Sequence, residues 1–207
     1  MDPIEQRLRR YYEAEAEQRL RPAHGDRRTR ICRGFATLVA SEARRSVVDI
    51  GSGPASDLEP FREHGVDYVG ADLALGNARL AAADDAAVVP ATLFALPFRD
   101  DAFPAGWSMS AFQHVPDHRI DEALAEFVRV LEPGAPVTIG LWGGRDEVIE
   151  SSYATSGIQM HRHFTLRTHE RIRAILAQHM VVGDEETFPA GPSDWRYHVA
   201  SARTPLR

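Results

Sequence analysis

Cysteine and lysine are the residue types that this 207-residue chain most clearly lacks. Its single cysteine, Cys32, excludes an internal disulfide and a multi-cysteine zinc site, and it suits a reducing compartment. All 24 basic residues are arginine, so lysine Schiff-base chemistry and a Walker-type phosphate loop are excluded. No apolar run is long enough to cross a membrane, and the polar N-terminus does not resemble a signal peptide. We therefore expect a cytoplasmic protein with one globular core and no membrane partner.

Charge is unevenly distributed along the chain, whose formal net charge is −6. Residues 1–45 hold 11 arginines against 7 acidic residues, whereas the remainder holds 13 arginines against 23. The acidic balance argues against a large nucleic-acid footprint. We expect the N-terminal arginines to form ion pairs on helix surfaces, and a nucleic-acid-binding arm is the alternative.

Two glycines follow a short apolar segment that suits a buried strand at residues 46–50. Gly51 and Gly53 form a tight turn, a helix-like segment comes next, and a second strand at 66–71 ends in Asp72. Glycine allows the backbone to approach a ligand closely, and the carboxylate can accept hydrogen bonds from both hydroxyls of a ribose. This order of features predicts a site for an adenosine-containing ligand at the end of an α/β sheet.

The turn departs from the G-x-G-x-x-G pattern of dinucleotide sites, because its last position is Ser56. The acidic residues Asp49 and Asp57 flank the turn. Carboxylates would repel a pyrophosphate but tolerate a cation such as the sulfonium of S-adenosylmethionine (SAM). An NAD-binding oxidoreductase is therefore a weak alternative.

Five segments in order resemble the class I SAM-dependent methyltransferases. Residues 48–53 resemble motif I of that family, and Asp72 stands at its ribose-binding acid. Residues 91–103 resemble the adenine-side loop, residues 108–115 the end of the fourth strand, and residues 129–135 the R-V-L-x-P-G-G turn. The resemblance implies an α/β, Rossmann-like three-layer sandwich. Its seven-stranded sheet is mostly parallel with the last strand antiparallel, under an N-terminal helical lid.

The pattern predicts one domain over residues 1–207: helices and lid at 1–45, a cofactor-binding core at 46–142, and a substrate-side loop, helix and hairpin at 143–207. Helices are expected at 3–20, 27–43, 55–64, 117–131 and 168–179, with a loop over 143–164. Strands are expected at 46–50, 66–71, 88–91, 107–111, 136–142, 181–188 and 195–202.

The resemblance also implies the cofactor contacts, with S-adenosylhomocysteine (SAH) as product. The methionine part would lie against Gly51, Ser52, Gly53 and Ser110, and the ribose against Asp72. The adenine would lie between Leu73 and Leu93, with Thr92 at its amino edge and Phe112 lining the pocket. Thr92 stands where the family usually has Asp, and its hydroxyl is a weaker acceptor. Asp49 would act through water or only structurally.

On the acceptor side, His114 is the candidate general base, and capping or packing beside the next helix is the alternative. Tyr12, on the lid helix, and Trp142, at the end of a strand, are candidate substrate contacts. His161 and His163 would share one face of an extended segment, so either of them, or Arg162, could line the acceptor site. No third metal ligand lies near them, and we expect a metal-independent enzyme.

We therefore expect a methyltransferase acting on oxygen or nitrogen of a small-molecule metabolite. An RNA methyltransferase that docks through the arginine-rich N-terminus is one alternative. A SAM-binding protein without activity, or a partner-dependent subunit, is another. A homodimer is left open.

Overall fold

The structure is a computed structural model that describes residues 2–16, 25–155, 158–189 and 195–206, with side chains except at 151–161. A seven-stranded sheet has the order β3-β2-β1-β4-β5-β9-β8. Its strands are β1 (Ser46–Ile50), β2 (Asp67–Asp72), β3 (Ala87–Pro90), β4 (Gly106–Met109), β5 (Pro136–Gly143), β8 (Val181–Pro189) and β9 (Arg196–Arg203). Neighbours among β1 to β5 pair in parallel, whereas β9 pairs antiparallel with β5 and β8. The predicted α/β sheet is confirmed.

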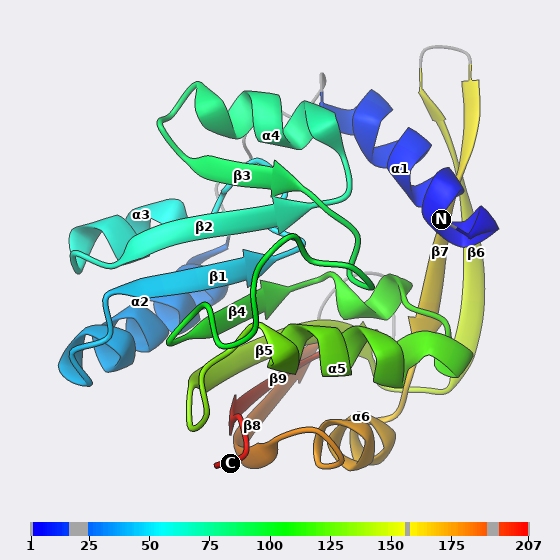
Figure 1. Cartoon of the computed structure of the whole chain (residues 1–207). Coiled ribbons are helices and arrows are strands. Elements are labelled where there is room, and N and C mark those ends of the chain that lie inside the picture. Colours follow the sequence, from blue (N-terminus) through cyan, green and yellow to red (C-terminus); the bar gives the residue numbers. More distant parts are fainter. Residues whose placement is uncertain (1, 17–24, 156–157, 190–194, 207) are drawn as a thin grey trace.

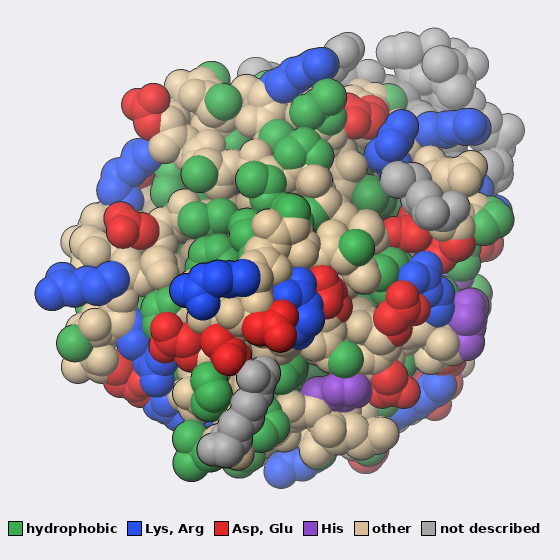
Figure 2. Space-filling model, viewed as in Figure 1, with side chains coloured by type: hydrophobic (Ala, Val, Ile, Leu, Met, Phe, Trp, Pro, Cys, Tyr) green, Lys and Arg blue, Asp and Glu red, His purple; other side chains and the backbone are tan. Residues whose placement is uncertain are grey.

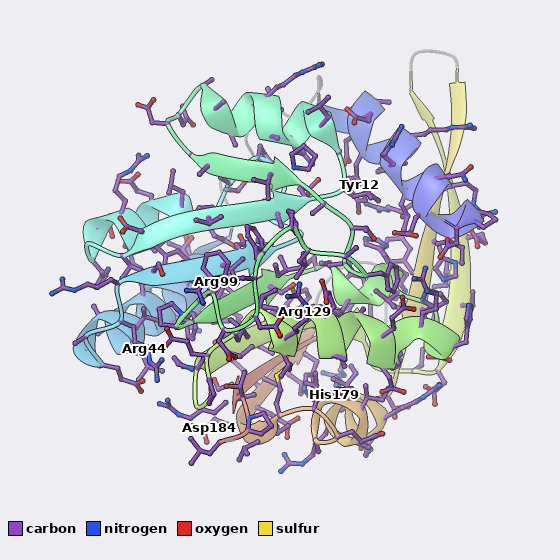
Figure 3. All side chains as sticks on the ribbon, in the orientation of Figure 1. Tyr12, Arg44, Arg99, Arg129, His179 and Asp184 are labelled. Atoms are coloured by element: carbon purple, nitrogen blue, oxygen red, sulfur yellow. The ribbon has the colours of Figure 1, made fainter. Side chains whose placement is uncertain are left out.

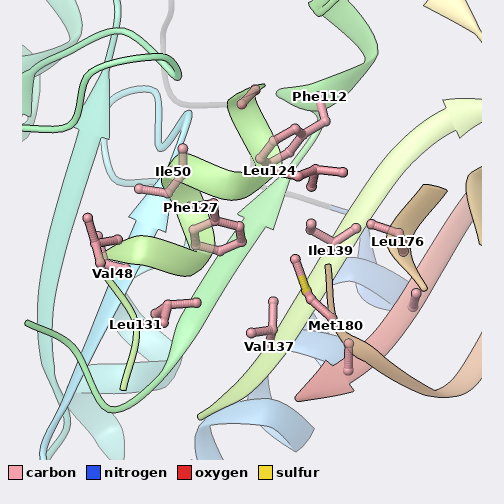
Figure 4. Close-up of a cluster of buried hydrophobic side chains, with 14 of the residues drawn as sticks. Val48, Ile50, Phe112, Leu124, Phe127, Leu131, Val137, Ile139, Leu176 and Met180 are labelled. Atoms are coloured by element: carbon pink, nitrogen blue, oxygen red, sulfur yellow. The ribbon is translucent and has the colours of Figure 1, made fainter. Parts of the chain in front are cut away.

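Helices cover both faces of this sheet (Figure 1). α2 (Asp26–Ser41), α3 (Leu58–Glu63) and α4 (Leu75–Ala82) lie on one face. α5 (Ile120–Arg129) and α6 (His169–Leu176) lie on the other, next to the irregular segment 91–105. The strands supply apolar residues to both faces, as expected for a buried parallel sheet. Phe127 of α5 packs on one side of it (Figure 4), and Trp107 packs on the other against Phe35 of α2.

The chain order places a ligand site at the carboxyl ends of the strands. From β1 the chain moves outward to β2 and β3, and then returns to the other side of β1 to form β4. The connections after β1 and β4 therefore diverge, which opens a crevice at the carboxyl ends of the two strands.

Local sequence signals explain several helix ends. α1 (Pro3–Ala16) begins with a capping box, because the Glu5 N–H donates to Asp2 Oδ1 and the Asp2 N–H donates to Glu5 Oε2. Thr168 caps α6 by accepting from the Arg171 N–H at 3.2 Å. Two short 3-10 turns, η1 (Phe112–His114) and η2 (Asp117–Arg119), lead from β4 into α5.

Two sequence predictions are wrong in their bounds. The helix expected from residue 55 begins at Leu58, because Ala55 has a φ of 60° and belongs to the turn before the helix. The loop expected over 143–164 is largely a hairpin of β6 (Glu147–Thr155) and β7 (Ile158–Leu166), which pair antiparallel outside the main sheet. α1 packs beside β7. The sequence did not indicate the hairpin because Glu, Ser, His and Arg interrupt the apolar residues of its two strands.

Five N-terminal arginines form ion pairs in the described part of the chain. The pairs are Arg7–Glu150, Arg27–Glu186, Arg28–Asp57, Arg33–Glu63 and Arg44–Glu42. On the face seen in Figure 2, basic and acidic side chains also lie next to one another. None of the helices that the structure describes is both long and apolar enough to cross a membrane.

Candidate functional site

A cavity of about 840 Å³ lies at the carboxyl ends of the parallel strands. α1 and β7 contribute its outer wall. Most of the residues predicted for cofactor and acceptor line it: Gly51, Ser52, Gly53, Asp72, Leu73, Thr92, Leu93, Ser110, His114, Tyr12 and Trp142. The fold thus brings residues from six separate segments to one site.

The glycine turn after β1 needs its glycines. Gly51 has a φ of 73° and Gly53 a φ of 56°, which are left-handed conformations that disfavour side chains. A Cβ on Gly51 would lie 2.4 Å from the Cβ of Ala111, in the turn after β4. The Gly51 N–H donates to the Ala71 carbonyl at 2.7 Å, which ties the turn to β2.

Asp72 links this turn to the start of α4. Its Oδ2 accepts from the Gly53 N–H at 2.8 Å. Its Oδ1 accepts from the Ala74 N–H and from Asn77 Nδ2, each at 2.9 Å. These contacts fix the carboxylate at the rim of the cavity.

Thr92 meets a carboxylate that sequence analysis did not assign to the site. Its hydroxyl donates to Glu5 Oε1 from the first turn of α1, and both residues line the cavity. The capping-box pattern explained Glu5 only as a helix start. No sequence signal connects residues 5 and 92, because the lid helix alone brings them together.

Ser110 holds a strained conformation at the end of β4, with a φ of 67°. Its hydroxyl and that of Tyr197 are hydrogen-bonded at 2.8 Å. Burial raises the pKa of Tyr197 to about 12, so this phenol stays protonated.

Asp49 lies behind the turn and is absent from the cavity wall. It accepts a hydrogen bond from Tyr68 Oη at 2.5 Å. Burial and then the neighbouring Asp57 raise the pKa of Asp49 to about 8. Asp57 in turn accepts from Arg28 at 2.6 Å and from Trp107 Nε1 at 2.8 Å. Arg28 lines the cavity beside the turn, and sequence analysis did not single it out.

The prediction that Phe112 lines the cofactor pocket is wrong. Phe112 is buried in the core, 5.8 Å from Phe127 between ring centroids (Figure 4). The 3-10 turn η1 sends consecutive side chains in different directions, so its neighbours Gln113 and His114 line the cavity and Phe112 does not.

His114 is held at both ring nitrogens. Nδ1 lies 2.6 Å from the carbonyl oxygen of His163, which can only accept, so Nδ1 carries a proton. In the neutral imidazole Nε2 is therefore the acceptor, and Tyr12 Oη donates to it at 2.8 Å. Tyr12 comes from α1, beside the ends of the strands (Figure 3). The arrangement leaves a basic nitrogen in the cavity wall, paired with a phenol.

Aromatic side chains surround the part of the cavity next to His114. Trp195 lies 5.5 Å from both Trp142 and Phe164 between ring centroids, and Phe164 lies 4.8 Å from His114. Phe164 escaped sequence analysis because the β7 strand was taken for a loop. Trp195 directly precedes β9, in a segment that was predicted as a strand but not assigned to the site.

The structure describes the side chain of only one of the two β7 histidines, His161 and His163. His163 is buried and hydrogen-bonded to Glu150 and Thr165. His161 pairs with Ser152 through the backbone, and its side chain lies outside the described part. No group of three or more His, Cys, Asp or Glu among the described residues could hold a metal ion.

Comparisons with known proteins show what this chain is similar to. Residues 48–139 match the family described as a methyltransferase domain. A protein of Mycobacterium avium (strain 104), named an uncharacterized methyltransferase, is 34% identical over 116 residues, 51% of this chain and 45% of that protein. The malonyl-[acyl-carrier protein] O-methyltransferase of Pseudescherichia vulneris is 37% identical over 94 residues, 44% of this chain and 37% of that protein. The chain thus matches less than half the length of these curated relatives.

Among solved structures, a similar one is the 1,6-didemethyltoxoflavin-N1-methyltransferase of Burkholderia thailandensis, determined with its substrate and SAH. The TM-score is 0.72 at 20% identity, over 99% of this chain and 91% of that chain. Residues 48–139 are therefore similar in sequence to methyltransferase domains, and the chain as a whole has the fold of SAM-dependent methyltransferases.

Proposed function

We propose that this protein is a SAM-dependent methyltransferase that acts on oxygen or nitrogen of a small molecule. One observation carries the proposal. The carboxylate of Asp72 is fixed to the glycine turn by the Gly53 N–H, at the rim of a cavity that also holds a paired imidazole and an aromatic wall. The cavity volume of about 840 Å³ lies within the usual range of small-molecule sites.

The residues present fit SAM. Asp72 suits the ribose hydroxyls, and Leu73 and Leu93 suit the two faces of the adenine. The methionine part would lie against Gly51, Ser52, Gly53 and Ser110. Glu5 and Thr92 together offer oxygen acceptors for the adenine amino group, so Glu5 supplies the carboxylate that position 92 lacks. Arg28, beside the turn, suits the carboxylate of the methionine part. When bound, the cofactor supplies an activated methyl group.

The chain's own residues would orient the acceptor and manage its proton. Trp142 and the neighbouring aromatic rings bind a flat acceptor and exclude water. His114 Nε2 takes the proton of a hydroxyl or ring N–H, and the His163 carbonyl keeps the imidazole in the tautomer that can accept it. We propose that this step proceeds without a metal ion.

Relatives support both acceptor atoms, since one is named an O-methyltransferase and one an N1-methyltransferase. An RNA acceptor would need the N-terminal arginines as a docking surface. The ion pairs of Arg7, Arg27 and Arg33 with acidic side chains argue against that use.

Calorimetric titration with SAM and SAH tests the proposal. We expect micromolar binding to the wild type and a loss of at least tenfold, or about 1.4 kcal/mol, in Asp72→Asn. Asparagine keeps the size of the side chain and removes the charge. Asp67→Asn, at the exposed start of the same strand, is the matched control and should bind as the wild type does. A folded wild type that binds neither ligand would rule out this function.

A further inference from the structure

Arg162 lines the cavity, and its guanidinium makes cation–π contacts with two aromatic rings. Its guanidinium lies over Phe164 at 4.6 Å and near Tyr11 at 5.0 Å from the ring centroids. Cation–π contacts of this kind hold the side chain in place and leave its positive charge unneutralised. Because Arg162 comes from β7 and Tyr11 from α1, the charge lies where the two outer elements of the cavity meet.

No acidic partner balances this charge in the described part of the chain. Arg162 takes part in no ion pair there, and its Nε lies out of reach of solvent without a hydrogen-bond partner. Arg28, the other arginine of the cavity wall, is paired with Asp57. A buried donor without a partner costs free energy, which a ligand oxygen can recover.

The acidic side chains of the cavity wall have other contacts. Asp2 and Glu5 pair with Arg119 from η2, and Asp72 accepts from backbone amides. Glu15 accepts from Tyr11 Oη at 3.2 Å. Each of these four carboxylates is thus hydrogen-bonded or ion-paired to a group other than Arg162.

Arg162 and His114 share a neighbour. Phe164 contacts the guanidinium on one side and the imidazole at 4.8 Å between ring centroids on the other. One flat molecule beside Phe164 could therefore present an anionic group to Arg162 and a reacting hydroxyl or N–H to His114.

We propose that the methyl acceptor is an aromatic anion, a planar ring that carries a carboxylate, and that Arg162 binds this carboxylate. Trp142, Trp195 and Phe164 bind the ring. The inference rests on the proposed function, because it assigns the acceptor half of the same cavity. Arg162 sets specificity by charge and touches neither the cofactor half nor the proton on His114.

The test compares two probes on the SAH-loaded protein: 3-hydroxy-2-naphthoate and its neutral methyl ester. Both have the same ring and hydroxyl, and only one has the charge. We expect the acid to bind at least tenfold tighter than the ester to the wild type, as measured by calorimetry. In Arg162→Gln the preference should fall below threefold, with SAH affinity unchanged.

Two further variants keep the result interpretable. Arg99→Gln removes the same charge from an exposed loop and should keep the full preference (Figure 3). Arg162→Lys keeps the charge and should retain most of the preference for the acid. This variant still tests the inference if Arg162→Gln fails to fold. An ester that binds as tightly as the acid, a preference that survives in Arg162→Gln, or no binding of either probe would overturn the inference. Failure of the wild type to bind SAH would instead overturn the proposed function.

Discussion

His114 is poised by two contacts that come from distant parts of the chain. The His163 carbonyl fixes the proton on Nδ1, and the Tyr12 hydroxyl occupies Nε2. An acceptor that gives its proton to Nε2 must take the place of the phenol or pass the proton through it. Tyr12 is therefore a positioning residue whose removal should alter the imidazole without altering the cofactor site.

Methyl transfer at varied pH tests both residues. We expect His114→Gln to lower kcat by about 10²-fold, the typical contribution of a general base, and to remove the acidic limb of the pH profile. Tyr12→Phe should shift that limb and leave His114 active. The measurement is transfer of labelled methyl from SAM to the aromatic acid.

SAH affinity in the two variants should equal that of the wild type, because neither side chain lies in the proposed cofactor half. If His114→Gln kept both the rate and the pH profile, the histidine would have only a structural role.

α1 is the element that joins the two halves of the cavity. Glu5 on its first turn reaches Thr92, Tyr12 reaches His114, and Glu13 accepts from the N–H groups of Leu75 and Gly76 at the start of α4. These polar contacts, together with the buried side chains of Leu8, Tyr11 and Ala16, hold α1 over the cavity.

The contribution of α1 to cofactor binding can be measured through Glu5. We expect Glu5→Gln to weaken SAM binding by three- to tenfold, since the neutral amide accepts a hydrogen bond less strongly than a carboxylate. Glutamine still serves in a capping box, so α1 should remain folded. Glu59→Gln on α3 is the surface control. Equal affinities in the two variants would place the adenine elsewhere.

The elements differ in how well the sequence predicted them. Apolar runs such as Ser46–Ile50 and Pro136–Gly143 showed the sheet, because a strand buried on both faces has a strong local pattern. The β6–β7 hairpin was missed, since it lies outside the sheet and Glu, Ser, His and Arg interrupt the apolar residues of its strands.

The site residues likewise differ in how well the sequence predicted them. Gly51, Gly53 and Asp72 were predictable because they follow their strands directly in the chain. Contacts such as Glu5 with Thr92 depend on how α1 docks, and no local pattern records that. Phe112 was misplaced because a 3-10 turn at η1, which the sequence did not indicate, decides which side chain faces the cavity.

At the scale of the whole molecule, buried titratable groups tie stability to pH. His198 is buried, stacked on His169 with ring centroids 5.2 Å apart. Burial and then His169 lower the pKa of His198 to about 4, from its ordinary value of 6.5. The unfolded chain therefore binds the proton more tightly than the native protein. This group costs stability as pH falls from 6.5 toward 4.

We expect protonation of His198, as pH falls from 6.5 toward 4, to lower the free energy of unfolding by roughly 1–3 kcal/mol. Asp49 acts in the opposite sense, because its raised pKa makes the native state hold a proton that the unfolded chain releases. The informative quantity is therefore the difference between wild type and His198→Gln in urea unfolding at pH 7 and pH 4.5. That difference should shift with pH, whereas His118→Gln, at an exposed histidine, should differ from wild type equally at both values.

The wall of the cavity comes from two sources. The glycine turn, Asp72 and His114 fall within residues 48–139, the part similar in sequence to methyltransferase domains. Tyr12, Arg162, Phe164 and Trp195 lie outside that part, on segments before and after it. If the proposed function holds, the segments that contact the acceptor are therefore separate in the chain from those that hold the cofactor. Grafting α1 together with the hairpin onto a related core is the corresponding route to a new substrate preference.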